Sequence, residues 1–125
     1  MFYGRKEVNI GESRRVHILN GMKKNLVEGQ EYRVYLDGEW DNGTYRLIFR
    51  FDDEPDACET FVKSYKIPKN LTLKVPPQVY CQMKGKCILA GATTCVELIK
   101  EECYNKLNSE ASETVLKLAE ELGLI

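Results

Sequence analysis

The sequence predicts an α+β protein made of two similar strand–helix–strand units followed by C-terminal helices. In residues 74–99, a strand-like segment runs into Pro76-Pro77, a short amphipathic segment follows, and a second strand reaches Gly91. A fainter version of the same order occupies residues 10–35. Each unit is too small to bury a core alone, so we expect the two units to pair within one fold.

Length and composition agree with a small folded protein. The chain has 125 residues, enough for one domain or for two very small repeats that share a core. It is 43% hydrophobic and 30% charged, which excludes disorder on composition alone. The formal net charge of -1 does not by itself mark a nucleic-acid-binding protein, so only an uneven charge distribution can create a basic face.

The first half of the chain alternates like a β structure. Apolar alternation predicts strands at residues 8–10 and 16–18 around a polar turn, and residues 21–26 fit one helical turn. A strand over 31–36 and a returning antiparallel strand over 44–51 enclose turn-forming Asp-Gly and Asn-Gly pairs around Trp40. The acidic loop that follows is the candidate boundary, so we divide the chain into a first unit with its β-hairpin (1–52) and a second unit with the helices (53–125).

The second half repeats this pattern and then becomes helical. Strands are expected at 61–67, 71–75 and 87–90, with a short helix over 78–83 that the two prolines open. In the tail, Val96, Ile99, Cys103 and Leu107 follow helical spacing. A second apolar stripe over 115–122 ends at Gly123, which suits a helix C-terminus.

The chemistry-bearing residues give little support for catalysis, and we expect no enzyme activity, no metal and no cofactor. The five cysteines form no C-x-x-C pair, and His17 is the single histidine. Cys81, Cys87 and Cys95 lie in apolar company, as expected of small buried hydrophobes in a reducing compartment. With no signal peptide and no apolar run near 18 residues, we expect a cytoplasmic protein without a membrane partner.

Charge is distributed unevenly along the chain. Basic residues concentrate in 5–24, and residues 63–86 contain six lysines and no acid. Acids gather at 52–59 and in the C-terminal part of the chain. The two basic stretches coincide with the two units, which leaves two interpretations open: an ordinary solvated surface, or a functional basic face.

Three groups of residues follow the order of a known family. The chain opens Met1-Phe2-Tyr3-Gly4, and its two units contain the sequences I-G-E-S-R-R-V-H-I-L-N-G-M-K-K (10–24) and V-P-P-Q-V (75–79), followed by C-I-L-A-G (87–91) and V-E-L (96–98). This order resembles that of the MraZ proteins in the SpoVT/AbrB swapped-hairpin superfamily, which open with Met-Phe-x-Gly. Arg15, Ile18 and Lys23 fall on motif positions of the family's first unit.

The resemblance implies a fold of two swapped-hairpin (AbrB-like) β units that form a pseudo-two-fold, β-barrel-like core with C-terminal helices. It also implies a homo-oligomeric transcriptional regulator that binds double-stranded DNA through a basic β surface and is nucleoid-associated. Arg15 is then the main contact, and the candidate DNA-binding residues are Arg5, Lys6, Arg14, Arg15, Lys23 and Lys24.

The chain also departs from the family pattern, which keeps a second function class open. Arg14 replaces a family glycine, and Leu71-Thr72 replaces the Gly-Arg pair of the second unit. The alternative is therefore a non-enzymatic protein-interaction or assembly protein that has the same fold and has lost DNA binding.

Overall fold

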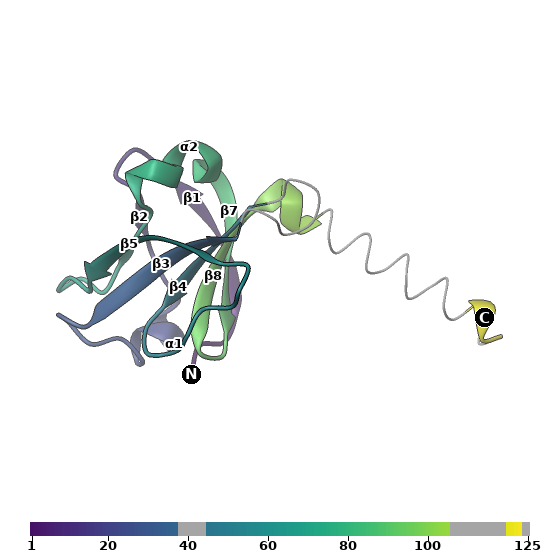
Figure 1. Cartoon of the computed structure of the whole chain (residues 1–125), viewed down its shortest axis with the longest axis horizontal. Helices are drawn as coiled ribbons and strands as arrows, with labels where there is room; N and C mark the ends of the chain where they lie inside the picture. Colours follow the sequence, from purple (N-terminus) through teal and green to yellow (C-terminus); the bar gives the residue numbers. More distant parts are fainter. Residues whose placement is uncertain (38–44, 106–119, 124–125) are drawn as a thin grey trace.

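The computed structural model describes residues 1–37, 45–105 and 120–123, and these form a mainly β structure (Figure 1). A six-stranded antiparallel sheet is accompanied by a two-stranded ribbon and short helices. The elements are β1 (Arg5–Ile10), β2 (Arg15–Val16), α1 (Asn20–Lys23), β3 (Glu31–Asp37), β4 (Arg46–Arg50), β5 (Thr60–Lys66), β6 (Leu73–Lys74), η1 (Pro77–Val79), α2 (Tyr80–Met83), β7 (Gly85–Ala92) and β8 (Cys95–Lys100).

The sheet has the strand order β1-β7-β8-β4-β3-β5 and is open, with β1 and β5 at its edges. The expectation of a barrel-like core is therefore wrong in this respect, because the sheet does not close on itself. The small ribbon formed by β2 and β6 is a separate layer.

Strands from the two predicted units pair with each other. β1 pairs with β7, from Arg5 opposite Ala90 to Ile10 opposite Gly85. β5 pairs with β3, and β2 pairs with β6. Each unit therefore supplies an edge strand to the other, and neither unit contains its complete set of backbone hydrogen-bond partners.

The two halves also repeat one another in backbone detail. The turns 11–14 and 68–71 are each closed by a backbone hydrogen bond, from Arg14 N to Gly11 O (2.9 Å) and from Leu71 N to Pro68 O (3.0 Å). Both turns end on a residue with positive φ, 59° at Arg14 and 53° at Leu71. Exchanging the halves gives the same strand order read from the opposite edge of the sheet, because β1 corresponds to β5, β3 to β7, and β4 to β8.

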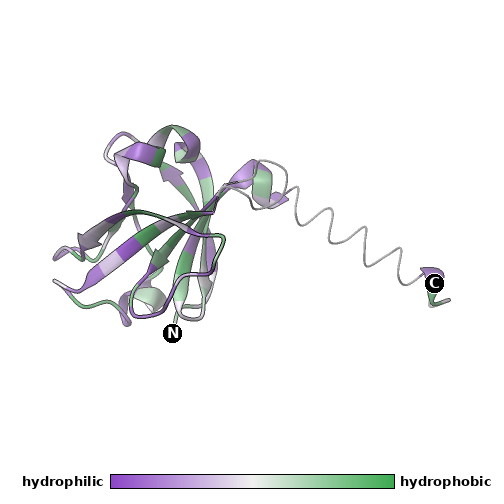
Figure 2. Ribbon diagram, in the orientation of Figure 1, coloured by the Kyte–Doolittle hydropathy of each residue, from purple (hydrophilic) through white to green (hydrophobic). Residues whose placement is uncertain are grey.

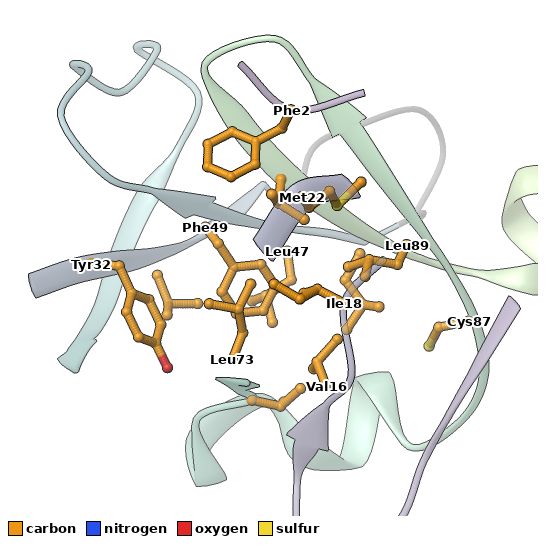
Figure 3. Packing of buried hydrophobic residues seen from close by; sticks show 14 of the residues in the cluster. Phe2, Val16, Ile18, Met22, Tyr32, Leu47, Phe49, Leu73, Cys87 and Leu89 are labelled. Atoms are coloured by element: carbon orange, nitrogen blue, oxygen red, sulfur yellow. The ribbon is translucent and has the colours of Figure 1, made fainter. Parts of the chain in front are cut away.

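The core fills the space between the sheet and the ribbon (Figure 3). Tyr32, Leu47, Phe49 and Leu89 project from the sheet, and Val16, Ile18, Leu73 and Val75 project from the ribbon and the segments after it. Met22 of α1 and Met83 of α2 are also fully buried. In Figure 2 the green of hydrophobic residues follows the central strands of the sheet. β4 and β8 are buried on both faces, which explains their nearly continuous apolar runs.

Most predicted elements agree with the structure, with three corrections. The strands predicted at 16–18 and 71–75 are instead two-residue strands at Arg15–Val16 and Leu73–Lys74. The helical spacing predicted from Val96 is wrong up to Lys100, because Val96 and Ile99 belong to β8, and the described helix begins at residue 101. β8 is buried on both faces, so its apolar residues do not alternate with polar ones and can be mistaken for the apolar face of a helix. Cys81 is exposed, whereas Cys87 and Cys95 are buried.

The hairpin tip with Trp40 and most of the second apolar stripe, including Leu107, lie outside the described residues. Leu122, at the end of that stripe, is exposed.

Gly91 provides a test of how the N-terminal segment packs on the sheet. A Cβ at this position would lie 2.5 Å from the carbonyl carbon of Phe2 and 2.6 Å from Tyr3 N. Because backbone atoms cannot move aside cheaply, we expect Gly91→Ala to lower the free energy of unfolding by about 1–3 kcal/mol in urea denaturation. Gly21→Ala in α1 is the control, since no atom lies within 4 Å of its Cβ. Equal stability of the two variants would contradict this close packing.

The buried thiols predict a loss of stability at alkaline pH. Burial raises the pKa of Cys87 and of Cys95 from 9.0 to about 11. The unfolded chain therefore ionises first, and the stabilisation present below pH 9 is lost as the pH rises towards 11. Between pH 8 and pH 10 each thiol should cost about 1.3 kcal/mol of unfolding free energy.

Urea unfolding at these two pH values measures the effect. Cys87→Ala should show a smaller pH-dependent loss than the wild type. The exposed-thiol variant Cys81→Ala should keep the full loss, and a Cys87→Ala variant with an unchanged pH dependence would refute the assignment.

Candidate nucleic-acid interface

The β2–β6 ribbon separates apolar side chains from basic ones. Its register places Arg15 opposite Lys74 and Val16 opposite Leu73. Val16 and Leu73 are 0% and 1% exposed and belong to the core. Because side chains alternate across a strand, Arg15 and Lys74 lie on the other face of the ribbon, where Arg15 is exposed and Lys74 is half-buried.

Arg14 and Arg15 have different roles in the structure. The positive φ of Arg14 places it in the turn, and its Nη1 donates to the carbonyl oxygen of Val75 at 3.1 Å. The Val75 N–H in turn donates to Arg14 O at 2.8 Å. Arg14 therefore fastens the turn to the start of η1, whereas Arg15 faces outward.

A cavity of about 210 Å³ lies beside the ribbon. Arg15, Lys66 and Lys74 contribute to its wall from β2, β5 and β6. Among the described residues every ion pair involves Arg46 or Arg50, so none of these three cations is within ion-pair distance of a carboxylate. The structure therefore brings three basic residues from both halves of the chain to one cavity wall, and Glu31 lies opposite Lys66 in the β3–β5 register.

Tyr32 connects this cavity to the core. Its ring is 1% exposed, and its Oη accepts a hydrogen bond from the Lys74 N–H at 3.0 Å. Burial raises the pKa of Tyr32 well above its ordinary value, so the hydroxyl keeps its proton at any physiological pH. The buried hydroxyl thus helps to hold the β6 backbone, and with it Lys74, in position.

The six predicted DNA-binding residues lie in three places: Arg5 and Lys6 on β1, Arg14 and Arg15 at the ribbon, and Lys23 and Lys24 at the end of α1. Arg5, at the start of β1, donates to the Tyr104 hydroxyl and stacks on that ring, and Lys6 follows it on the strand. Lys23 ends α1 and Lys24 follows it, and Figure 1 shows α1 and α2 on opposite sides of the β structure. Of the six, the structure places only Arg15 in the wall of the cavity beside the ribbon.

Sequence reasoning did not select Lys66 and Lys74 as candidate residues. The signal was present, because both lie in the acid-free run 63–86. The sequence alone does not reveal that β6 pairs with β2, and this pairing places Lys74 directly opposite Arg15.

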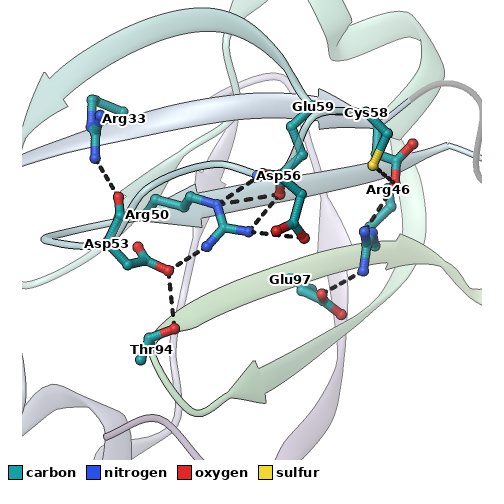
Figure 4. A network of polar contacts seen from close by, with 10 residues as sticks. Arg33, Arg46, Arg50, Asp53, Asp56, Cys58, Glu59, Thr94 and Glu97 are labelled. Carbon is teal, nitrogen blue, oxygen red and sulfur yellow. Dashed lines mark hydrogen bonds and ion pairs between the residues drawn. The ribbon is translucent and has the colours of Figure 1, made fainter.

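The opposite face of the sheet holds a buried network of ion pairs (Figure 4). Arg50 is 7% exposed and binds Glu59 through Nη2 at 2.8 Å, together with Asp53. Arg46 joins Asp37 (2.9 Å) to Glu97 (2.7 Å), so it links β3, β4 and β8. The Arg33 side chain donates to Asp53 O.

These contacts hold the acidic segment that follows β4 against the sheet. Burial alone lowers the pKa of Arg50, but its hydrogen bonds to Glu59 and the charge of Asp53 outweigh this effect and raise the pKa above its usual value. Partial desolvation and the nearby Asp37 carboxylate also raise the pKa of the Cys58 thiol. Removing one partner of such a network leaves a buried charge uncompensated, so its role is structural.

Within residues 1–37, 45–105 and 120–123, no three His, Cys, Asp or Glu side chains are grouped so that they could hold a metal ion. None of the helices in this part of the chain has both the length and the apolar character needed to cross a membrane.

Comparison of the chain with protein-family models, with curated proteins and with solved structures found no match. The geometry of the ribbon and its cavity therefore carries the functional argument.

The Tyr32 hydroxyl predicts a local effect on the ribbon. Tyr32→Phe leaves the Lys74 N–H without its acceptor, and the free energy of unfolding should fall by about 1–3 kcal/mol. Hydrogen exchange at the Lys74 amide should accelerate more than exchange in β7. Tyr45→Phe, which removes a hydroxyl from a 38% exposed side chain, serves as the control. Unchanged exchange at Lys74 would show that this hydrogen bond does not hold β6.

Proposed function

We propose that the protein binds duplex DNA through the outer face of the β2–β6 ribbon and acts as a transcriptional regulator. The main observation behind this proposal is that Arg15 and Lys74 lie directly opposite one another on that face, and Lys66 lines the same cavity. Like charges directly opposite each other destabilise a β pair. A polyanion that binds across both side chains converts this unfavourable arrangement into a favourable one.

The shape of the ribbon supports this choice of ligand. The major groove of B-DNA admits a two-stranded β ribbon, and lysine and arginine bind its phosphates while releasing counterions. Arginine can also bridge the two acceptors of a guanine edge, which makes Arg15 the candidate for sequence preference.

One chain offers only a few such contacts, so the proposal includes assembly into a homo-oligomer. Several ribbons on one DNA raise the effective concentration of each for its site. The interleaved pairing of β1 with β7 and of β5 with β3 supports the swapped-hairpin arrangement that the resemblance implies. On this proposal the protein acts in the cytoplasm at the nucleoid, without catalysis.

The second candidate function is a protein-interaction module with the same fold. It is favoured by the open edge strand β5, which carries Phe61 at 54% exposure. Unpaired strand edges can add a strand from a partner. Purified protein that is free of nucleic acid and does not bind duplex DNA at low salt would support this alternative over the first.

Fluorescence anisotropy with a labelled duplex at several salt concentrations tests DNA binding. Three or four phosphate contacts predict a loss of affinity of roughly 40- to 150-fold between 50 and 200 mM salt. Arg15→Gln should weaken binding by about eightfold at 0.1 M salt and reduce the slope of log K against log salt by about 0.9.

Lys86→Gln removes one charge from β7, away from the ribbon, and is the matched control. Arg15→Gln and Lys86→Gln with equal affinities would reject the ribbon as the interface. A wild-type protein with no binding at low salt would reject the function itself.

A further inference from the structure

The cavity beside the ribbon has the composition of an oxyanion site. Besides Arg15, Lys66 and Lys74, its wall includes Tyr65 and Asn70, and the described lining contains no carboxylate. Its volume of about 210 Å³ corresponds to about seven water molecules at roughly 30 Å³ each. A phosphate group of five heavy atoms therefore fits together with bridging waters.

Tyr65 supplies an observation that is independent of the charges. Its Oη is buried and has no hydrogen-bond partner among the described residues. The ring is held in place by Tyr32 at 5.8 Å between centroids and by Lys63, whose Nζ lies 5.2 Å from the ring centroid. A buried hydroxyl without a hydrogen-bond partner is unfavourable, so a ligand oxygen that accepts a hydrogen bond from it stabilises the complex.

Asn70 adds a second neutral donor. Its Oδ1 already accepts a hydrogen bond from Thr72 Oγ1 at 2.9 Å. The amide therefore has its two Nδ2 hydrogens left for a ligand or for water. Three cations and two neutral donors thus line one small cavity.

The repeat within the fold shows that the cavity is specific to one side. Ile10 lies opposite Gly85, and Ile67 is hydrogen-bonded to Gly29 and Gln30, so these two isoleucines correspond. By the same correspondence Val8 takes the place of Tyr65 and Asn9 that of Lys66. Along the ribbon, His17 takes the place of Lys74. The fold alone therefore does not create this set of donors.

The geometry points to a binding site for one phosphate group, held by Arg15, Lys66 and Lys74 with a hydrogen bond from Tyr65 Oη. This inference rests on the proposed function in one respect only, that the phosphate belongs to the DNA backbone. A free phosphate offers the same tetrahedral oxyanion, so the experiment has one arm for each source.

The first arm measures DNA affinity of the full-length protein as a function of salt. Lys66→Gln should weaken binding about eightfold at 0.1 M salt and about fourfold at 0.2 M, because one phosphate contact is lost. Tyr65→Phe should weaken binding about three- to tenfold with no change in the salt slope, because it removes a hydrogen bond and no charge.

Two variants serve as matched controls for this arm. Lys86→Gln removes an equal charge elsewhere and should leave both affinity and slope unchanged. Asn9→Lys places a cation at the corresponding position of the other half, and added to Lys66→Gln it should not restore binding. Wild-type DNA binding that neither Lys66→Gln nor Tyr65→Phe alters would overturn the cavity and leave the proposed function standing.

The second arm titrates inorganic phosphate into ¹⁵N-labelled protein without DNA. The amide signals of Tyr65, Lys66 and Lys74 should shift in a saturable way in the wild type and much less in Lys66→Gln. If the wild type does not bind DNA, these shifts assign the cavity to free phosphate and only the proposed function fails. If neither DNA affinity nor the phosphate titration depends on Lys66, the inference is wrong.

Discussion

Backbone hydrogen bonding between the two halves is the constraint on which the rest of this structure depends. β1 finds its partner in β7, β5 finds its partner in β3, and the ribbon takes one strand from each half. An isolated half would expose unpaired strand edges and an uncovered apolar face. The ribbon, the cavity and the core exist only when both halves are in place.

The two faces of the sheet differ in polarity. One face is apolar and is closed by the ribbon and the short helices. The other carries Arg46 and Arg50, whose charges are matched by acids from the neighbouring strands and from the segment after β4. Five acids are held in these pairs, whereas Arg15, Lys66 and Lys74 form no ion pair among the described residues. The net charge is near zero, but acidic and basic residues form ion pairs on one face of the sheet, while basic residues without ion pairs in the described part of the chain lie at the ribbon.

Local sequence patterns predict much of the fold, whereas the residues that line the candidate cavity come together through contacts between distant segments of the chain. Alternation at residues 31–36 and the prolines before η1 located β3 and the short helices, because these signals act over a few residues. β8 was read as helical, since a strand buried on both faces loses its alternation. The sequence predicts Arg15 as a candidate residue, whereas Lys66 and Tyr65 come to the same cavity only through tertiary packing, which no local pattern contains.

Interleaving also dictates when this chain can fold during synthesis. β1 is made before its partner β7, which lies about 75 residues later, between Gly85 and Ala92. At roughly 5–20 residues per second, the ribosome needs about 4–15 s to supply it. β1 must wait unpaired for that time, so its backbone N–H and C=O groups depend on water for hydrogen bonds until β7 has been made.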